Sequence, residues 1–331
     1  MNKLTEGHIS TLTKELKGLK IRLDEPLKNH TYIKIGGPAD VMIDATTRDE
    51  LIRSYRLAKS LNIPVFVLGS GSNIVVGDLG IRGLVIKNRA DKIRVKQYLG
   101  GIKNKQLSVA GAVLEADSGV IVNQLVRHTV GEGLGGLQYF LGLPGTLGGA
   151  IYNNSHYQGQ LIGDRIKEVL VLDSAGQEKI YTKVQMKFGY DTSILHKTKE
   201  LVVSATFVLA GGDQDKLWSE ATSYAKNRSK TQPLSLPSSG CMFQNISQSQ
   251  AHLLGIQNIT RGAGYLIDQT GLKGTKVGKM AVSDKHANFM VNLGGASAMD
   301  VWNLVKPVRR RVKQKFGITL KPEVFFVGQQ D

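Results

Sequence analysis

The sequence predicts an α+β protein of more than one domain, and three observations lead to this prediction. The chain has 331 residues, which is too long for one small core. Patterns typical of strands and of amphipathic helices alternate along it, and 41% of its residues are hydrophobic. Its 38 glycines gather in four clusters between those patterns. Because glycine allows turns and close approach of the backbone, the clusters indicate a large ligand held by several loops.

The N-terminal part of the chain predicts a helix followed by a β–α–β unit. Residues 1–20 alternate apolar and charged side chains, which favours an amphipathic helix at the edge of the fold. After an extended segment and a first strand, Thr47 or Asp49 caps a second helix, over 47–62. The apolar strand that follows, over 63–69, completes the unit.

A loop of small residues directly follows that strand. Its bare backbone N–H groups form a nest suited to phosphate oxygens. No Gly-Lys-Ser/Thr follows, which excludes a P-loop, and the strand pattern of residues 74–76 excludes a Rossmann turn, which opens a helix. An ordinary tight turn is the alternative interpretation. The loop consists of Gly69, Ser70, Gly71, Ser72 and Asn73.

The next part of the chain combines a helical stretch, over 120–134, with a second glycine-rich loop, over 137–150. Because this loop holds a proline between glycines and a Gly-Gly-Ala run, we expect it to wrap a planar or phosphorylated ligand rather than form a regular helix. Strands over 168–174 and 199–210 close this part. The glycine pair before Asp213 is the clearest boundary signal in the chain.

Beyond this boundary the composition changes. A helix leads into a Pro/Ser loop over 232–239, and shorter helix and strand patterns follow. A long helical pattern over 299–317 precedes a terminal strand over 318–328. These patterns predict a smaller α+β domain.

Composition and charge exclude several classes of protein. A single cysteine rules out a disulfide framework and a Cys-based metal site, and we expect no metal. No apolar run reaches the roughly 18 residues of a membrane span, and the N-terminus lacks a signal peptide, so we expect a soluble, cytoplasmic protein. The formal net charge of +16 is compatible with anionic ligands. Only 6% of the residues are aromatic, so few side chains are available to stack on nucleic-acid bases. We therefore expect small anionic ligands rather than nucleic acid.

Six short motifs occur in one order over residues 31–328. Together they resemble the UDP-N-acetylenolpyruvoylglucosamine reductases, flavoenzymes that make UDP-N-acetylmuramate for peptidoglycan. The resemblance covers most of the chain and is to the shorter type of the family, which lacks an inserted tyrosine-bearing loop. The motifs are IGGPAD, LGSGSN, GLPGTLGGA, GYLIDQTGLKG, HANFMVN and LKPEVFFVG.

The resemblance implies the fold in more detail. It implies an FAD-binding domain of the vanillyl-alcohol-oxidase (PCMH) type in two subdomains, a smaller α+β substrate-binding domain, and a monomer as the favoured state. The expected bounds are 1–26 for an N-terminal helix, 27–212 for the FAD-binding domain with subdomains over 27–90 and 91–212, 213–320 for the substrate-binding domain, and 321–331 for a C-terminal strand.

The resemblance also implies the ligands and the residues that hold the cofactor. FAD is bound without a covalent bond, NADPH is the hydride donor, and UDP-N-acetylglucosamine enolpyruvate is the substrate. The loop over 69–73 takes the FAD pyrophosphate. The second glycine loop lines the flavin with Pro144, Gly145, Thr146, Gly148 and Gly149.

Two residues match the family's catalytic groups. Hydride addition to the enolpyruvyl methylene carbon builds negative charge on the carboxylate, and the adjacent carbon must then be protonated. Cys241, in SSGCMFQN, matches the family's proton-donating serine or cysteine, and Glu323, in LKPE, matches its catalytic glutamate. Outside these motifs, Cys241 is typical of a small buried hydrophobe and Glu323 of a surface residue.

Other residues are expected to bind the sugar nucleotide. Asn245 matches the family, whereas Gln244 replaces a usual Lys or Arg. His286 fits a structural histidine equally well, and Lys273 also fits a solvent-exposed lysine. The expected substrate-binding residues are Tyr190, Gln244, Asn245, Lys273, His286 and Asn288.

One departure from the family concerns the arginine that stabilises the enolate. The family has Tyr-Arg-x-Ser where this chain has Tyr190-Asp191-Thr192-Ser193, so a carboxylate stands at the catalytic position of a cation. The segment over 153–157 departs from the family as well, and two changes near one pocket are expected to compensate each other.

Three explanations of this departure are open. The one that we favour is that another cation, Arg165, Arg261 or Lys273, supplies the charge. Alternatively, Asp191 is protonated or turned away and the remaining groups suffice. In the third, the chain is a flavin-binding relative that oxidises a sugar or lactone, or a catalytically impaired nucleotide-sugar binding protein.

Overall fold

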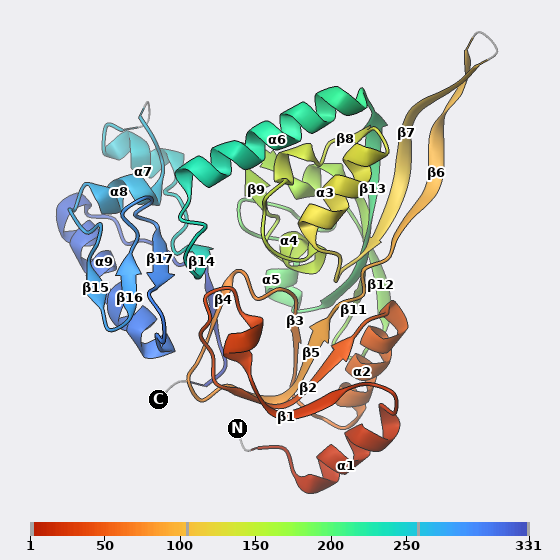
Figure 1. Ribbon diagram of the computed structural model, residues 1–331, viewed down its shortest axis with the longest axis horizontal. Helices are drawn as coiled ribbons and strands as arrows, with labels where there is room; N and C mark the ends of the chain where they lie inside the picture. The colour runs from red at the N-terminus through yellow and green to blue at the C-terminus, as the bar shows by residue number, and fades with distance from the viewer. Residues whose placement is uncertain (1–2, 104–105, 257–258, 330–331) are drawn as a thin grey trace.

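The structure is a computed structural model that describes residues 3–103, 106–256 and 259–329. Figure 1 shows three parts: a first lobe in red and orange, a second lobe in yellow and green from which a long β-hairpin projects, and a third domain in blue on the other side. Helix α6, Gln214–Thr231, runs from the second lobe to the third domain.

The first lobe is a four-stranded sheet with two helices. Its elements are α1 Glu6–Glu15, β1 Ile21–Pro26, β2 Pro38–Ala45, α2 Arg48–Ser60, β3 Val65–Leu68 and β5 Ile81–Asn88. The strand order is β1-β2-β5-β3, with β5 parallel to both neighbours and β1 antiparallel to β2. Thr47 caps α2 in a reciprocal capping box with Glu50, which explains why the helix begins at Arg48. The predicted β–α–β unit is therefore present.

The second lobe is built on a larger antiparallel sheet. Its strands are β6 Ile93–Lys103, β7 Gln106–Asp117, β8 Leu134–Gly135, β9 His156–Tyr157, β10 Gln160–Leu161, β11 Ile166–Leu172, β12 Glu178–Thr182 and β13 Leu201–Gly211. Its helices are α3 Val122–Gly131, α4 Leu147–Tyr152 and α5 Leu195–Thr198. The main strand order is β12-β11-β13-β7-β6, with β8 on the end of β13 and β9–β10 as a separate hairpin.

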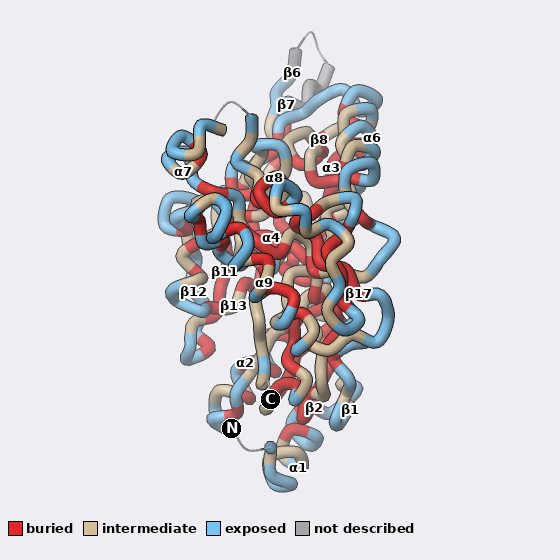
Figure 2. Tube along the Cα trace, turned by 90° about the vertical axis from the view of Figure 1, so that its left-hand side faces the viewer, coloured by how far each residue is buried: buried red, intermediate tan, exposed pale blue. Residues whose placement is uncertain are grey.

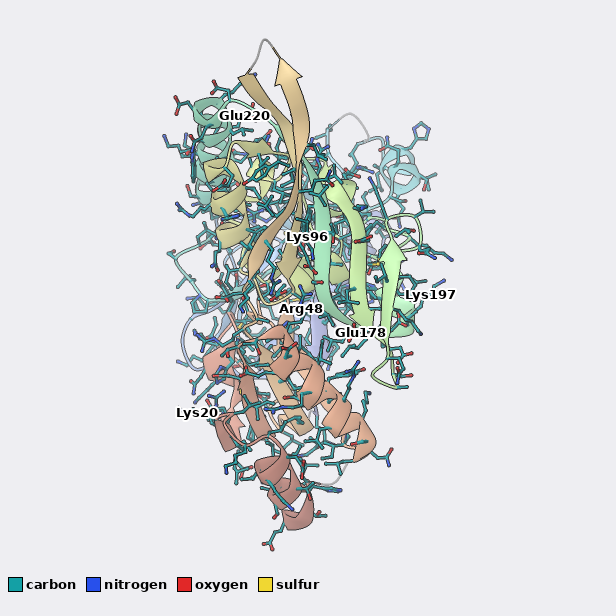
Figure 3. All side chains as sticks on the ribbon, turned by 90° about the vertical axis from the view of Figure 1, so that its right-hand side faces the viewer. Lys20, Arg48, Lys96, Glu178, Lys197 and Glu220 are labelled. Carbon is teal, nitrogen blue, oxygen red and sulfur yellow. The ribbon has the colours of Figure 1, made fainter. Side chains whose placement is uncertain are left out.

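Arg48 joins the two lobes. Its Nη2 atom lies 2.8 Å from Glu115 Oε1 and 2.5 Å from Asp117 Oδ1, both on β7. Lys96 of β6 adds a second cation, 3.2 Å from Glu115 Oε2. Figure 3 labels Arg48 and Lys96 along this junction, where α2 meets the larger sheet. Since both carboxylates are buried, these cations compensate charges that would otherwise destabilise the junction.

The third domain is a small antiparallel sheet covered by helices. Its elements are β14 Ser238–Cys241, α7 Gln248–Leu253, α8 Ala263–Asp268, β15 Lys276–Val277, β16 Met280–Val282, β17 Phe289–Asn292 and α9 Ala298–Phe316. The strand order is β14-β17-β16-β15. Helix α9 buries Val301, Leu304, Val305, Val308 and Val312, one stripe at helical spacing, in the core of this domain.

The C-terminal strand returns to the first lobe. Strand β18, Phe325–Val327, pairs in parallel with β4, Ile74–Val76, which directly follows the first glycine loop. Ile33, Ile35 and Val75 of the first lobe belong to the core of the third domain. Consequently β18 lies beside the first glycine loop, and the Phe325 N–H donates to the Asn73 carbonyl at 3.1 Å.

Two helix boundaries differ from the expected ones. The N-terminal helix ends at Glu15, and Ile21–Pro26 is an edge strand of the first sheet rather than part of a helical segment. Helix α6 starts at the expected domain boundary, but its Leu217 and Ala221 are buried in the core of the second lobe. The amphipathic pattern of α6 could not show which neighbouring core would receive it.

The second glycine loop also differs from expectation, because its Gly-Gly-Ala run is helical. Helix α4 begins at Leu147, after Pro144, so the proline interrupts none of its hydrogen bonds. A Cβ on Gly148 would lie 3.1 Å from the Cβ of Ser118. The glycine thus serves close packing of a short helix rather than a turn.

Figure 2 shows buried residues along the inside of the molecule and exposed residues over much of α6 and α7. Within the described residues, no helix combines the length and the apolar character needed to cross a bilayer.

Candidate active site

A cavity of about 1140 Å³ lies where the three parts of the molecule meet. The first glycine loop, over 69–73, forms one side, and the second glycine loop contributes residues from Gly142 to Gly149. Cys241 and Asn245 line it from the third domain, and Glu323 lines it from the segment before β18. All ten residues expected to bind the cofactor line this one cavity.

The two glycine loops pack against each other without room for side chains. A Cβ on Gly69 would lie 2.3 Å from Thr146 Oγ1, and one on Gly145 would lie 3.0 Å from Ser72 Oγ. Ser72 Oγ donates a hydrogen bond to the carbonyl of Pro144, at 3.4 Å. These contacts bring two loops that are far apart in the sequence to a single wall of the cavity.

The first glycine loop presents free amides. In the described part of the chain, no backbone N–H of residues 70–73 donates to a protein acceptor. Gly71 has φ +66°, and a Cβ there would lie 2.6 Å from the carbonyl oxygen of His30. Consecutive unpaired amides held open in this way form an anion-binding nest.

Cys241 reaches the cavity through an irregularity in β14. The pairing of β14 with β17 shifts register between Ser238 and Cys241, and Gly240 between them has φ +82°. Such bulges turn the following side chain away from its regular direction. Asn288 then fixes the next residues, because its amide donates to the carbonyl of Phe243 at 2.7 Å and accepts from the Phe243 N–H at 3.0 Å.

Glu323 lies beside Cys241 because the C-terminal segment is bonded to both neighbouring parts. The Glu323 N–H donates to the carbonyl of Met242 at 2.9 Å. Asn73 of the first glycine loop donates its amide to the Glu323 carbonyl at 3.3 Å. The backbone of Glu323 is therefore held between the predicted cofactor loop and the predicted proton donor.

The surroundings of Cys241 and Glu323 favour the protonated form of each group. Burial, followed by the nearby Glu323 carboxyl, raises the pKa of the Cys241 thiol. Burial, followed by the charge of Asp191, raises the pKa of Glu323 well above the usual range of a glutamate. A raised pKa favours the protonated form, which can donate a proton, so both groups are candidate acids.

Tyr190 and Asp191 form the tip of a tight turn on the cavity wall. The Tyr190 hydroxyl accepts a hydrogen bond from the Asn245 N–H at 3.2 Å, which connects the turn to the third domain. Asp191 Oδ1 lies 3.1 Å from His156 Nε2. The His156 ring lies against the Tyr190 ring, with 4.8 Å between the ring centres.

Comparisons with known proteins agree with this geometry. Residues 39–180 match the family described as "FAD binding domain", and residues 232–327 match "UDP-N-acetylenolpyruvoylglucosamine reductase, C-terminal domain". The UDP-N-acetylenolpyruvoylglucosamine reductase of Streptococcus agalactiae serotype III (strain NEM316) is 38% identical over 321 residues, which cover 97% of this chain and 99% of the relative. The chain belongs to the UDP-N-acetylenolpyruvoylglucosamine reductase family.

Other members of the family extend this result. The reductase of Caldanaerobacter subterraneus subsp. tengcongensis is 35% identical over 327 residues, which cover 99% of this chain and 100% of the relative. The crystal structure of the reductase from Thermus caldophilus has a TM-score of 0.70 and 29% identity, and the match covers 93% of this chain and 98% of that one. These matches confirm the predicted fold, an FAD-binding domain of the PCMH type with a reductase C-terminal domain. They also confirm the prediction that the chain is an FAD-dependent oxidoreductase.

The residues of the site fit FAD. The unpaired amides of the first loop suit a pyrophosphate, which accepts hydrogen bonds and carries negative charge. The second loop presents backbone and small residues to the cavity, which leaves space for a flat ring system. The cavity is also large enough for a cofactor and part of a second ligand.

Four residues expected to bind the substrate do not line the cavity. Asn288 is buried, and both hydrogen bonds of its side-chain amide are to the backbone of Phe243. Lys273 forms an ion pair with Asp268, at 2.9 Å. The other two are His286, which packs beside α8 at Gly264, and Gln244, whose backbone N–H donates to the carbonyl of Lys321.

The three cations expected to replace the family arginine also lie elsewhere. None of Arg165, Arg261 and Lys273 lines the cavity. The cavity is instead lined by three cations that the sequence analysis did not identify, Lys59, Lys199 and Arg228.

Arg228, near the end of α6, is 6% exposed and lies over the ring of Tyr157 with 4.3 Å between its guanidinium carbon and the ring centre. Its only sequence signal is its place before the Pro/Ser loop. That signal does not distinguish it from the many surface cations of this basic chain.

Proposed function

We propose that this chain reduces UDP-N-acetylglucosamine enolpyruvate to UDP-N-acetylmuramate with NADPH, in the synthesis of peptidoglycan precursors. The observation that carries the proposal is the meeting of Cys241, Glu323 and both glycine loops in one cavity. Family membership supplies the substrate class, and this meeting supplies the groups that the reaction needs. FAD, when bound, would accept the hydride of NADPH and deliver it to the methylene carbon of the substrate.

The residues of the chain provide the proton and the environment. Cys241 carries a protonated thiol at the cavity wall and donates the proton that the carbon beside the carboxylate requires. Glu323, also protonated, donates a hydrogen bond toward the substrate carboxylate as negative charge builds up. Tyr190 and Asn245, which line the cavity, are the substrate-binding residues that this proposal retains.

The arrangement of charges keeps a second function open. Asp191 places a carboxylate near Glu323, where negative charge would oppose an enolate. A flavin-dependent oxidase of a sugar or lactone would tolerate this carboxylate. The two functions differ in whether the enolpyruvyl sugar nucleotide reoxidises the protein.

An anaerobic two-step spectrum of the purified holoprotein tests the proposal. We expect NADPH to bleach the visible absorption of bound FAD and the enolpyruvyl sugar nucleotide to restore it. Bleaching without restoration would favour a different acceptor, and a colourless protein would contradict both functions.

Substitution of Cys241 tests its role in the same assay. Because an alanine has no proton to donate, Cys241→Ala should slow restoration about 100-fold, within the range usual for loss of an acid group. Cys241→Ser keeps a donor and should be slowed less. Equal rates for the two variants would contradict proton donation by this residue.

The remaining expectations belong to the same proposal. A cytoplasmic location and a monomeric state accompany an enzyme that uses NADPH and a nucleotide sugar. Binding of nucleic acid is not expected, and sedimentation of the holoprotein with and without DNA would test both the monomeric state and this expectation.

A further inference from the structure

The turn that carries Asp191 is fastened to the segment that carries His156. The Gly189 N–H donates to the Thr192 carbonyl at 3.0 Å, which closes the turn around Asp191. Asn154 donates its side-chain amide to the Gly189 carbonyl at 2.9 Å. Because Asn154 precedes His156 by two residues, the turn and the β9–β10 hairpin form one structural unit.

Asp191 is held there at a conformational cost. Its φ of +50° lies in the left-handed region, which few residues with a side chain occupy. Its carboxylate is 8% exposed, and Oδ2 has no hydrogen-bond partner among the described residues. A buried carboxylate in a strained turn needs a compensating charge, and His156 is the group in contact with it.

The contact with Asp191 decides which ring nitrogen of His156 remains available to bond a ligand. His156 Nε2 lies 3.1 Å from Asp191 Oδ1, and a carboxylate oxygen faces a ring N–H rather than a bare ring nitrogen, because it only accepts hydrogen bonds. In the described part of the chain, Nδ1 has no hydrogen-bond partner. The ring is fixed by Tyr190 on one face and lines the cavity, with its side chain 26% exposed. A protonated His156 therefore offers Nδ1–H as a free donor.

Other cations of the cavity have different partners. Arg228 lies over Tyr157 and donates to Gln232 at 3.2 Å. Lys199 donates to the Tyr152 hydroxyl at 3.3 Å. His156 alone contacts Asp191 among the ion pairs found in the described residues.

We propose that His156, protonated and held by Asp191, is a catalytic residue that stabilises the negative charge on the substrate carboxylate, and that Asp191 is its positioning residue. This inference rests on the proposed function. The hydride bonds to the methylene carbon, and the electrons of the C=C bond shift toward the carboxylate. His156 Nδ1–H donates a hydrogen bond to that carboxylate and keeps its proton. The carbon next to the carboxylate takes the proton of the Cys241 thiol, and water then returns a proton to the thiolate.

Rapid mixing of the FAD-loaded protein separates this role from a structural one. In His156→Gln and in Asp191→Asn, restoration of FAD absorption by the enolpyruvyl sugar nucleotide should slow about 100-fold, as expected for loss of a donor to a developing oxyanion. The loss should fall on this step and not on bleaching by NADPH. The double variant should be no slower than the slower single variant, because the two residues act as one unit.

A variant that moves the cation provides the sharpest test. His156→Ala combined with Asp191→Arg removes the pair and places a permanent positive charge on the turn. We expect this variant to restore absorption at least tenfold faster than His156→Ala alone. Single variants with wild-type rates, equal slowing of both steps, or no recovery with arginine would each overturn the inference.

The protonation of His156 has a readout that does not depend on turnover. In a long-range proton–nitrogen NMR spectrum of the oxidised protein labelled with ¹⁵N-histidine, the signal that disappears in His156→Gln should show both ring nitrogens protonated at neutral pH. In Asp191→Asn it should change to the neutral ring. A neutral ring in the wild type would overturn the inference. Failure of wild-type restoration would instead contradict the proposed function, and this spectrum would still decide whether Asp191 holds a protonated His156.

Discussion

At the scale of single residues, the site depends on acids kept in their neutral forms. Glu323 follows a proline near the end of the chain, and the sequence pattern around it favours the surface. Its carboxyl nevertheless faces a cavity beside Cys241 and Asp191, where burial and the Asp191 charge raise its pKa. The motif indicated which residue to examine, but its ionisation depends on neighbours from other parts of the fold.

Replacement of Glu323 by glutamine should therefore raise stability while it lowers turnover. A raised pKa in the folded state means that the unfolded chain ionises first, so this glutamate costs the folded protein stability as pH rises above the usual glutamate value of about 4.3. Glu323→Gln removes that cost. We expect its free energy of unfolding in urea to exceed that of the wild type near neutral pH and to approach it at lower pH.

The matched control for this variant is Glu132→Gln, which removes the same charge from an exposed position at the end of α3. Its difference from the wild type should not grow with pH in the same way. A Glu323→Gln variant that is less stable than the wild type near neutral pH would contradict the raised pKa.

At the scale of elements, close backbone packing shapes the cofactor wall. The sequence indicated both glycine loops as ligand-binding, and both line the cavity. The pattern did not reveal that the second loop ends in a helix, because glycine is a poor helix former and only tertiary contacts make it suitable there. The sequence analysis also did not identify the long hairpin of β6 and β7, although these two strands pair mainly with each other.

Gly69→Ala tests this packing directly. Its added methyl group would lie 2.3 Å from Thr146 Oγ1 and would push the two loops apart. We expect the purified variant to lose most of its bound FAD, measured by the ratio of visible to ultraviolet absorption. Gly131→Ala is the control, because no atom lies within 4 Å of a Cβ at that glycine, and it should keep its FAD. Full FAD content in Gly69→Ala would show that the loops can separate without loss of the cofactor.

At the scale of the whole molecule, the net charge affects how fast the protein meets its charged ligands. The formal net charge is +16, and NADPH is an anion. Attraction between them should accelerate encounter at low ionic strength, and salt should screen it because the Debye length falls to about 10 Å at roughly 0.1 M.

We therefore expect the second-order rate constant for FAD reduction by NADPH to fall about tenfold when salt is raised from low to high concentration, within the usual range for steered encounters. Reoxidation by dioxygen, which is uncharged, is the control and should change little. A salt-independent reduction rate would show that the net charge does not act at the NADPH site.

The β–α–β unit, the two glycine loops and the acids Cys241 and Glu323 could be predicted from the amino-acid sequence, because each is marked by a short motif of neighbouring residues. The pairing of β18 with β4, the packing of α6 on the second lobe and the place of Arg228 in the cavity wall became visible only in the folded protein. The same holds for the contact of Asp191 with His156. These outcomes depend on which distant surfaces bury each other, and no local pattern of residues encodes that choice.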